Sequence, residues 1–290
     1  MPYSVDTLPQ EKWPPLLKEI PDPPQSLFYA GSVPDWNTHA FLAVVGSRTY
    51  SSYGKDVCEK LIQGLRGYPI TIVSGLALGI DAIAHRSAIE TGLPTIAVPG
   101  SGLAPQALYP RSHRHLADDI LSHGGMLLSE FEPTFKATPW SFPQRNRIMA
   151  GMSHAVLVIE ATQKSGTLIT SKLATEYNRD VFTVPGSIFS PTAQGPHMLI
   201  RLGATIIRNS NDILDALNMS PKESPVADNI YEGCSQREKD MLHIIIQSPC
   251  SRDDLAQALQ LPIHEINTHI SILEIKGFVR EKLGQIEIIS

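Results

Sequence analysis

The stretch FLAVVGSRTYSSYGKDVCEKLIQGL, residues 41–65, reads as one strand, one tight turn and one helix. Its first five residues form a continuous apolar run, which is typical of a parallel strand covered on both faces. A glycine and a serine end the run, and a helical stretch follows. Strand–turn–helix is the repeating unit of a doubly wound parallel sheet, so this stretch decides the fold class.

The same unit recurs along the chain. Residues 199–218 supply a closing strand and helix, so the sequence predicts an α/β domain with a doubly wound parallel sheet over residues 38–218. Ligands of such sheets bind at the carboxyl ends of the strands. The apolar runs that we predict as strands are FLAVVG (41–46), ITIVSG (70–75), TIAVPG (95–100), MLLSEF (126–131), AVLVIEA (155–161) and VFTVPGS (181–187).

Two different segments flank this domain. Residues 1–37 are rich in proline, and we expect an irregular lead-in with a short helix or turn at 16–20. It would pack on the main domain through Trp13, Leu17 and Phe28.

The C-terminal part begins after a polar linker at 219–232. Residues 233–290 predict three helices followed by two short strands about a glycine turn, the order of elements in a winged helix. Ser251 is the expected N-cap of the second helix, with Asp254 three residues on. In the third helix an apolar stripe recurs at helical spacing, formed by Ile263, Ile266, Ile270 and Leu273.

Charge is distributed unevenly along the 290 residues, whose net charge is −5. Residues 38–218 carry 15 basic and 13 acidic side chains, whereas residues 231–290 carry 6 and 9. Only the middle block is positive, so we expect any anion site there rather than a broad basic coat. With 42% apolar and 18% charged residues, the composition excludes a disordered or fibrous protein.

Metal, disulfide and membrane signals are weak. Cys58, Cys234 and Cys250 form no close pair in the sequence, and Cys58 is expected to be buried. His113 and His115 lack partners at metal-ligand spacing and are expected at the solvated surface. No secretory signal is visible and no apolar run approaches the ~20 residues that span a bilayer, so we expect a cytoplasmic protein without membrane contact.

Three loops follow predicted strands and open helices: VVGSRTYSSYG (44–54), SGLALGID (74–81) and KSGTLIT (164–170). Glycines let the backbone approach a ligand, helix N-termini favour an oxyanion, and Arg48 can bind a phosphate bidentately. One such turn could equally be an ordinary strand–helix connection. Three at neighbouring strand ends favour a phosphate site. Neither a Walker loop nor GxGxxG occurs in them, so no nucleotide cofactor is indicated.

The segment WSFPQRNRIMAG (140–151) combines hydrogen-bond donors with aromatic rings. Bases could stack on Trp140 or Phe142. The alternative is that the rings belong to the core and the arginines pair with acids such as Glu130 or Glu132. No serine stands in a recognisable order with a histidine and an acid, so no catalytic residue is predicted.

Taken together, these motifs resemble the DNA-processing protein A family, also called DprA or Smf. The matching set is GSRxxSxYG (46–54), SGLAxGID (74–81), FPxRNRIxAG (142–151), IEA (159–161), SGTLIT (165–170) and VFxVPGS (181–187). The resemblance extends over about residues 13–290 and includes WPPLLKEIPDPP (13–24) and GPHMLIRLGA (195–204).

The resemblance implies an extended Rossmann-like domain that binds single-stranded DNA without sequence preference. It implies a non-enzymatic homodimer without a cofactor that protects incoming DNA and loads the recombinase RecA in natural transformation. The implied phosphate pocket and its border consist of Gly46, Ser47, Arg48, Gly75, Gly79, Phe142, Arg145, Asn146, Arg147, Ser165, Gly166 and Thr167.

Some features depart from the family pattern. Many members carry a small helical domain ahead of the proline-rich segment, and we find none here. Some place a lysine four residues before the FP proline, where this chain has Pro139, so Lys136 is the nearest substitute. The acidic C-terminal module suits a DNA major groove poorly and favours a protein-contact role.

Two other functions remain open at this point. The sheet and the SGT loop also resemble the cytokinin-activating phosphoribohydrolases, which would make the protein a nucleotide-processing enzyme. Here the double glycine of their loop is missing, and Thr170 stands where their catalytic glutamate would be. The other alternative is a winged-helix regulator that binds duplex DNA through residues 233–290.

Overall fold

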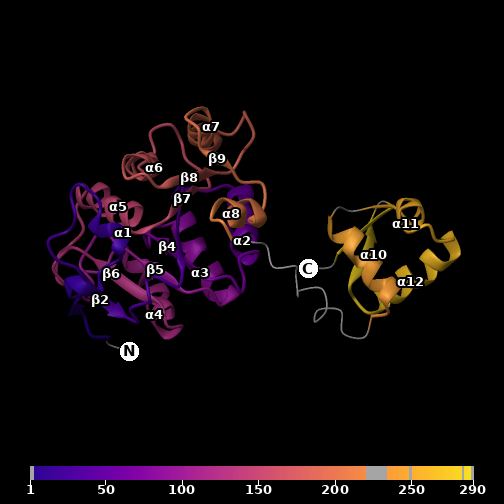
Figure 1. Ribbon diagram of the computed structural model, residues 1–290, viewed down its shortest axis with the longest axis horizontal. Helices are drawn as coiled ribbons and strands as arrows, with labels where there is room; N and C mark the ends of the chain where they lie inside the picture. The colour runs from indigo at the N-terminus through magenta and orange to yellow at the C-terminus, as the bar shows by residue number, and fades with distance from the viewer. Residues whose placement is uncertain (1–2, 220–233, 248–249, 283, 289–290) are drawn as a thin grey trace. The chain divides into compact units, whose positions relative to one another are not determined.

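The computed structural model describes residues 3–219, 234–247, 250–282 and 284–288. The chain divides into two compact units, residues 1–220 and residues 221–290 (Figure 1). From residue 220 on, the expected linker lies outside the described residues, and the domain boundaries at 38 and 233 stay predictions.

Nine strands of the described residues form one sheet in the first unit. Their order across the sheet is β1-β2-β6-β5-β4-β3-β7-β8-β9, and every ladder from β6 to β9 is parallel. The predicted doubly wound sheet is therefore confirmed. The bounds are β1 (Asp6–Thr7), β2 (Phe28–Gly31), β3 (Ala40–Val45), β4 (Ile70–Ser74), β5 (Thr95–Ala97), β6 (Met126–Ser129), β7 (Ala155–Val158), β8 (Asp180–Thr183) and β9 (Thr205–Ile206).

The strand order reverses beside β3. From β3 the chain moves outward through β4, β5 and β6, then returns to β7 on the other side of β3. At such a reversal the connections leave the sheet in opposite directions, and a crevice opens at the carboxyl ends of the two strands. The fold thus places the ends of β3 and β7 at one site.

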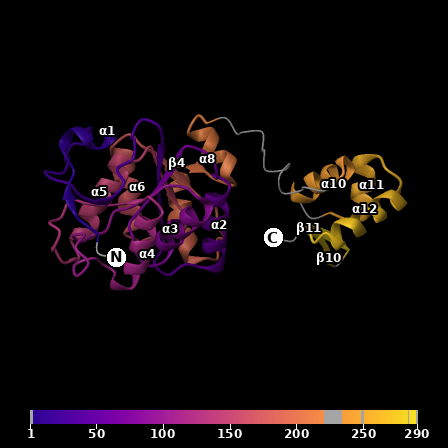
Figure 2. The same ribbon diagram turned by 90° about the horizontal axis from the view of Figure 1, so that it is seen from below.

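Helices cover both faces of the sheet, as Figure 2 shows. Along β3, Phe41, Ala43 and Val45 face one buried cluster, while Leu42 and Val44 face the other. Burial on both sides explains why the strand is apolar at every position. One face packs on α1 (Pro15–Lys18), α5 (Ser141–Met152), α6 (Thr167–Glu176) and α7 (Gln194–Arg201); the other packs on α2 (Ser52–Gln63), α3 (Ile80–Thr91), α4 (Arg114–Ser122) and α8 (Ser210–Ala216).

The N-terminal lead-in is more regular than predicted. Strand β2 pairs antiparallel with β6, and β1 pairs antiparallel with β2. The segment FYAG of β2 contains no proline, so its backbone can join the ladder between the proline-rich stretches. Trp13, Leu17 and Phe28 are buried, as predicted.

The described residues of the second unit form three helices and an antiparallel hairpin. These are α10 (Gln236–Gln247), α11 (Arg252–Leu259), α12 (Ile263–Ile275), β10 (Val279–Lys282) and β11 (Gln285–Ile288). Ser251 and Asp254 form the expected capping box. Of the apolar stripe on α12, Ile266, Ile270 and Leu273 are buried and Ile263 is exposed. The order of elements agrees with a winged helix, and that interpretation stays a prediction.

Candidate functional site

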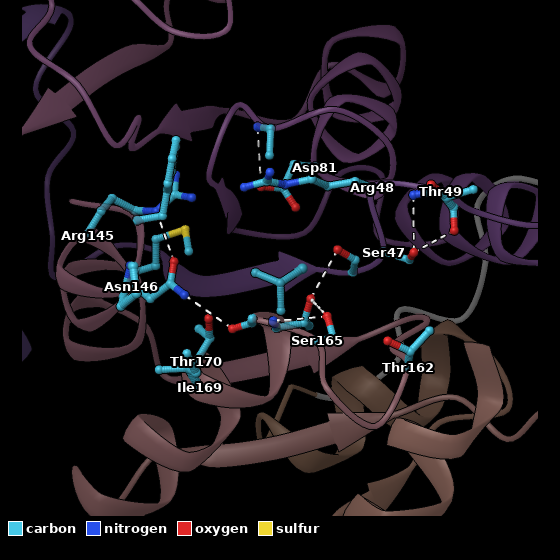
Figure 3. A pocket seen from close by; sticks show the side chains of 18 of the residues that line it. Ser47, Arg48, Thr49, Asp81, Arg145, Asn146, Thr162, Ser165, Ile169 and Thr170 are labelled. Carbon is cyan, nitrogen blue, oxygen red and sulfur yellow. Dashed lines mark hydrogen bonds between the residues drawn. The ribbon is translucent and has the colours of Figure 1, made fainter. Parts of the chain in front are cut away.

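A pocket of about 650 Å³ lies at the carboxyl ends of β3 and β7, where the strand order reverses (Figure 3). The loop after β3, the start of α3, the first turns of α5 and the start of α6 all contribute to its wall. Nine of the predicted site residues line it, namely Gly46, Ser47, Arg48, Phe142, Arg145, Asn146, Ser165, Gly166 and Thr167.

Two glycines allow the loop after β3 and the loop before α3 to pack closely against each other. The N–H of Ile80 donates to the Ser47 carbonyl at 3.2 Å, which joins the start of α3 to the loop after β3. Gly79 has φ +83°, and a Cβ there would lie 2.3 Å from the Ser47 oxygen. A Cβ at Gly46 would lie 2.6 Å from Cγ1 of Ile80. Gly79 was predicted as a pocket residue. It lies outside the pocket wall and permits this close approach of the two loops.

Arg48 is the exposed cation of the pocket. Its guanidinium carbon lies 5.2 Å from the centroid of the Phe142 ring, within the range of a cation–π contact. Among the described residues, no carboxylate lies within ion-pair distance of Arg48. The contact with Phe142 therefore positions an exposed positive charge that forms no ion pair with a described residue, although Arg48 lies close enough to the buried carboxylate of Asp81 to help lower its pKa.

Arg145 is buried beneath the same pocket, with 5% of its surface exposed. Its Nη1 donates to the carbonyls of Gly75 and Val98, and its Nε donates to Oδ1 of Asn146 at 3.0 Å. A Cβ at Gly75 would lie 2.3 Å from that Nη1, so glycine leaves room for the guanidinium. Gly75 itself does not line the main pocket.

The carboxylate of Asp81 is buried near Arg145. Asp81 accepts from the N–H groups of Gly75 at 3.1 Å and Ala77 at 3.4 Å. Burial raises the pKa of Asp81, while Arg145 and these hydrogen bonds act in the opposite direction. Burial also lowers the pKa of Arg145 to about 10, so its guanidinium stays charged at neutral pH. Arg145 therefore carries a permanent positive charge, and its hydrogen bonds are made to other groups of the protein.

Hydrogen bonds connect the third loop, residues 164–170, to the loop after β3 and to α5. Thr167 Oγ1 donates to the Gly46 carbonyl at 3.1 Å, and Asn146 Nδ2 donates to the Gly166 carbonyl at 3.4 Å. Ser165 Oγ donates to Thr167 Oγ1 at 2.9 Å. Helix α6 begins at Thr167, so the positive end of its dipole lies at the pocket.

Arg147 does not line the pocket, contrary to its predicted place at the groove. Its Nη2 forms an ion pair with Glu130, and its Nη1 donates to the carbonyl of Asp22 at 2.5 Å. The alternative from the sequence, an arginine paired with Glu130, holds for this residue. Burial raises the pKa of Glu130, and Arg147 opposes that rise.

Two further residues that the sequence analysis considered lie outside the pocket wall. Trp140 is 56% exposed but does not line the pocket; its ring packs edge-on against Phe131 and Phe135. Lys136 is exposed and also lies outside the pocket wall. The stacking of bases on Trp140 and the role of Lys136 as a substitute for the family's lysine stay predictions.

The histidine and cysteine predictions are partly correct. Cys58 is buried, as predicted, and burial raises the pKa of its thiol. His113 is not on the surface, because it is 6% exposed and its Nδ1 hydrogen-bonds the Leu76 carbonyl at 2.8 Å. Within the residues that the structure describes, no three histidine, cysteine or acidic side chains gather as metal ligands would, and no helix could cross a membrane.

Glu160 was quoted in a motif but not predicted as a functional residue. It accepts from the Ser51 N–H at 2.9 Å, the Ser51 hydroxyl at 2.6 Å and the Thr192 hydroxyl at 2.7 Å. A Cβ at Gly54 would lie 2.3 Å from its Oε2. Glu160 thus connects the start of α2 to Thr192, which lines the pocket. The IEA strand end and the glycine in the first turn of α2 were the available signals.

The wall combines charge, hydroxyls and apolar surface. Its charged side chains are the guanidiniums of Arg48 and Arg145 and the carboxylate of Asp81. Apolar area comes from Phe142, Met149 and other residues. The hydroxyl groups come from Ser47, Thr49, Thr162, Ser165, Thr167, Thr170 and Thr192. A phosphate ester with an attached ring system fits this mixture better than a bare anion does.

Known proteins are similar to this chain in both sequence and fold. A sequence model of the family described as DNA recombination-mediator protein A matches residues 4–218. The chain belongs to this family. Protein Smf of Escherichia coli is 37% identical over 276 residues, which cover 93% of this chain and 73% of that protein. DNA processing protein DprA of Streptococcus pneumoniae is 44% identical over 198 residues, 68% of each chain.

Solved structures of the DprA family agree with this membership. The X-ray structure of the Streptococcus pneumoniae protein superimposes with a TM-score of 0.68 at 42% identity, covering 73% of this chain and 74% of that one. The Helicobacter pylori protein superimposes with a TM-score of 0.67 at 28% identity, covering 75% and 98%. The Helicobacter structure was described for its single-stranded DNA binding mode. The family resemblance inferred from the motifs is confirmed.

Proposed function

We propose that the protein binds single-stranded DNA without sequence preference and without catalysing a reaction. In this proposal it protects incoming strands and loads RecA onto them during natural transformation and recombination. The observation that carries the proposal is Arg48, an exposed guanidinium without an ion-pair partner among the described residues, positioned over Phe142 at the reversal of the strand order.

Backbone phosphates are the proposed ligands of the pocket. Arg48 can hold a phosphate through its planar fork, while the buried Arg145 and the start of α6 add positive potential. Contacts to phosphate carry no information about base sequence, so this mode of binding is independent of sequence. The net charge of −5 supports one concentrated site over a broad basic surface.

A nucleotide-processing enzyme is the weaker alternative. Thr170, which stands where the phosphoribohydrolases carry a glutamate, is 1% exposed. Among the lining side chains only Asp81 is a carboxylate, and it accepts from two backbone N–H groups beside Arg145. That environment suits a structural anion rather than a general base. Incubation with nucleoside monophosphates should release no free base, and release of a base would favour the enzyme.

The proposed homodimer has apolar surface available on the sheet unit. Ile188, Phe189 and Leu202 are 78%, 89% and 75% exposed, and Ile206 on β9 is 44% exposed. Large apolar side chains at this exposure are common in protein interfaces. Sedimentation equilibrium should give the mass of two chains, and a monomer at all concentrations would contradict the dimer. RecA filament assembly on a strand coated with single-strand binding protein, with and without this protein, tests the loading proposal.

The decisive experiment replaces Arg48. In the full-length protein, Arg48→Ala should weaken binding of a fluorescent single-stranded oligonucleotide about tenfold to a hundredfold, as expected for one charged hydrogen-bonding contact. It should also reduce the slope of log affinity against log salt by about 0.7. Anisotropy titrations across a salt series measure both quantities.

Arg66→Ala is the matched control for this experiment, because Arg66 is an exposed arginine of the same unit that lies outside the pocket wall. The control removes the same charge and should leave the affinity within about twofold, since surface charges distant from the ligand act weakly through salt. Equal losses in the two variants would assign the binding to general electrostatics and remove the pocket from the proposal.

A further inference from the structure

A small hollow adjoins the main pocket beside the loop that precedes α4. The hollow has a volume of about 30 Å³ and shares Arg48, Ala77, Phe142 and Arg145 with the main pocket. Beyond these residues its wall adds Leu78, Tyr109 and Pro110, among others. A ligand phosphate beside Arg48 would therefore be flanked by a second surface that the motifs did not indicate.

Tyr109 presents the exposed ring of this second surface. It is 46% exposed, and its ring centroid lies 5.7 Å from that of Phe142 with the planes tilted by 55°. Arg48 lies over the Phe142 ring, so part of that ring is already occupied by a side chain of the protein. Leu78, 49% exposed, adds apolar area beside the tyrosine.

The loop that carries Tyr109 is held by hydrogen bonds that involve buried serines. The N–H of Tyr109 donates to the hydroxyl of Ser101 at 3.1 Å, and the hydroxyl of Ser129 donates to the Ser101 carbonyl at 2.8 Å. Both serines are buried. Support of this kind lets an exposed ring keep its position, which reduces the entropy lost when a ligand stacks on it.

We propose that Tyr109, with Leu78 beside it, is a stacking surface for a base of the strand whose phosphate is held by Arg48. The proposal rests on the single-strand binding proposed above and adds a base contact to it. A hollow of about 30 Å³ cannot enclose a base, so the base lies across the ring of Tyr109. Every base has a π-face, which keeps the contact tolerant of sequence.

This contact requires an unpaired base. In a duplex the faces of a base are covered by its neighbours, and an aromatic side chain reaches them only after unstacking. Arg48 and the pocket could hold a phosphate of either kind of strand, whereas Tyr109 adds affinity only for a flexible single strand. Tyr109 is therefore proposed as the residue that distinguishes the single strand from the duplex.

The test compares an oligothymidylate with an abasic oligonucleotide of the same length and charge, binding to the full-length protein. Tyr109→Ala should weaken binding of oligothymidylate about five- to 150-fold, the range for loss of one stacked base, and should change abasic binding less than twofold. Tyr109→Phe should keep the wild-type preference for bases, because it keeps the ring. Thermal unfolding of each variant checks that the fold is unchanged.

Tyr53→Ala is the matched control, because Tyr53 is a tyrosine of similar exposure, 47%, that lines neither hollow. It should leave the affinity for both oligonucleotides unchanged. Equal weakening of both oligonucleotides by Tyr109→Ala would overturn the proposal, as would no weakening of either. A wild-type protein that binds both oligonucleotides equally would overturn the base contact alone, whereas a wild-type protein that binds neither would overturn the proposed function.

Discussion

The arginines of the two units are used in different ways. In the C-terminal unit each arginine of the described residues forms an ion pair with a glutamate, namely Arg237–Glu265, Arg252–Glu281 and Arg280–Glu287. At the pocket of the sheet unit, Arg48 has no such partner among the described residues and lies over an aromatic ring. The comparison teaches that the presence of arginine does not mark an anion site. A site needs an arginine that is exposed and forms no ion pair with the protein.

Three arginines of the sheet unit form a graded series. Arg48 is exposed and unpaired among the described residues, Arg147 is paired with Glu130, and Arg145 is buried with its donors on backbone carbonyls. The first is available to a ligand, and the other two hold the structure. Replacement of Arg48 should therefore reduce ligand affinity, whereas replacement of Arg145 should reduce the stability of the fold.

The largest effect on stability is expected for Arg145→Ala. This change leaves Asp81 buried without its nearby positive charge, and it removes donors from the carbonyls of Gly75 and Val98. Each buried acceptor that loses its donor costs about 1–3 kcal/mol, and Asp81 loses a favourable charge interaction as well, so we expect a loss of several kcal/mol. Urea unfolding followed by tryptophan fluorescence measures this, because Trp13, Trp36 and Trp140 all lie in the sheet unit.

Arg48→Ala provides the contrast in the same assay. Because Arg48 is exposed, its replacement should change the free energy of unfolding by no more than about 0.5 kcal/mol. Equal destabilisation by the two replacements would break the distinction between a free and a structural arginine.

A smaller effect is expected from pH in the sheet unit. His85 is fully buried, with Nδ1 2.7 Å from the Thr95 hydroxyl. Burial, with a contribution from His113, lowers the pKa of His85 from 6.5 to about 3. Protonation then favours the unfolded state, so the free energy of unfolding falls by about 1.4 kcal/mol for each unit between pH 6.5 and pH 3. From pH 6.5 to pH 5 the loss amounts to about 2 kcal/mol.

In the C-terminal unit the pKa of one capping carboxylate is lowered. Hydrogen bonds from Ser251 hold the pKa of Asp254 below its ordinary value of 3.8. The stability that Asp254 contributes is present above pH 3.8 and is lost as the pH falls through its lowered pKa.

His85→Gln isolates the histidine from other groups that titrate, including the carboxyls of Asp81 and Glu130. The variant should unfold with a flatter dependence on pH between 6.5 and 5, measured by urea titration with tryptophan fluorescence. Parallel curves for the variant and the wild type would show that His85 does not cause the loss.

The smallest effect is expected for Arg252→Ala in the C-terminal unit. Its Nη2 lies 2.8 Å from Glu281 Oε2 and its Nη1 2.9 Å from Asn267 Oδ1, at a partly exposed position. Such pairs contribute about 0–1 kcal/mol. Single-strand affinity should stay within about twofold of the wild type in the anisotropy assay. A loss comparable to that of Arg48→Ala would place DNA contacts in this unit and remove the contrast between the units.

The parallel sheet could be predicted because burial on both faces leaves an unusually clear trace in the sequence. Residues 40–45 are apolar at every position, and the glycine and serine after them mark the strand end. The grouping of the loops around Arg48 also followed from sequence, since parallel strands place their carboxyl ends along one edge.

Other features depend on contacts between residues that are distant in the sequence. Arg147 and Arg48 look equally suitable as ligands, but Asp22, which contacts Arg147, is 125 positions away. Tyr109 stands in a segment without a helix or strand pattern and meets Phe142 only in the folded chain. Strand β2 has four residues between proline-rich stretches, too few for a periodic signal.

The antiparallel strand β2 has a consequence for the edge of the sheet. Without residues 1–37, β6 would become an outer strand with fully buried apolar side chains and a row of unpaired backbone groups. Such an edge is a template for aggregation. The lead-in instead ends the sheet with β1, which has two exposed residues, Asp6 and Thr7. A segment that the sequence predicts as an irregular lead-in therefore acts as the protection of the sheet against edge-to-edge assembly.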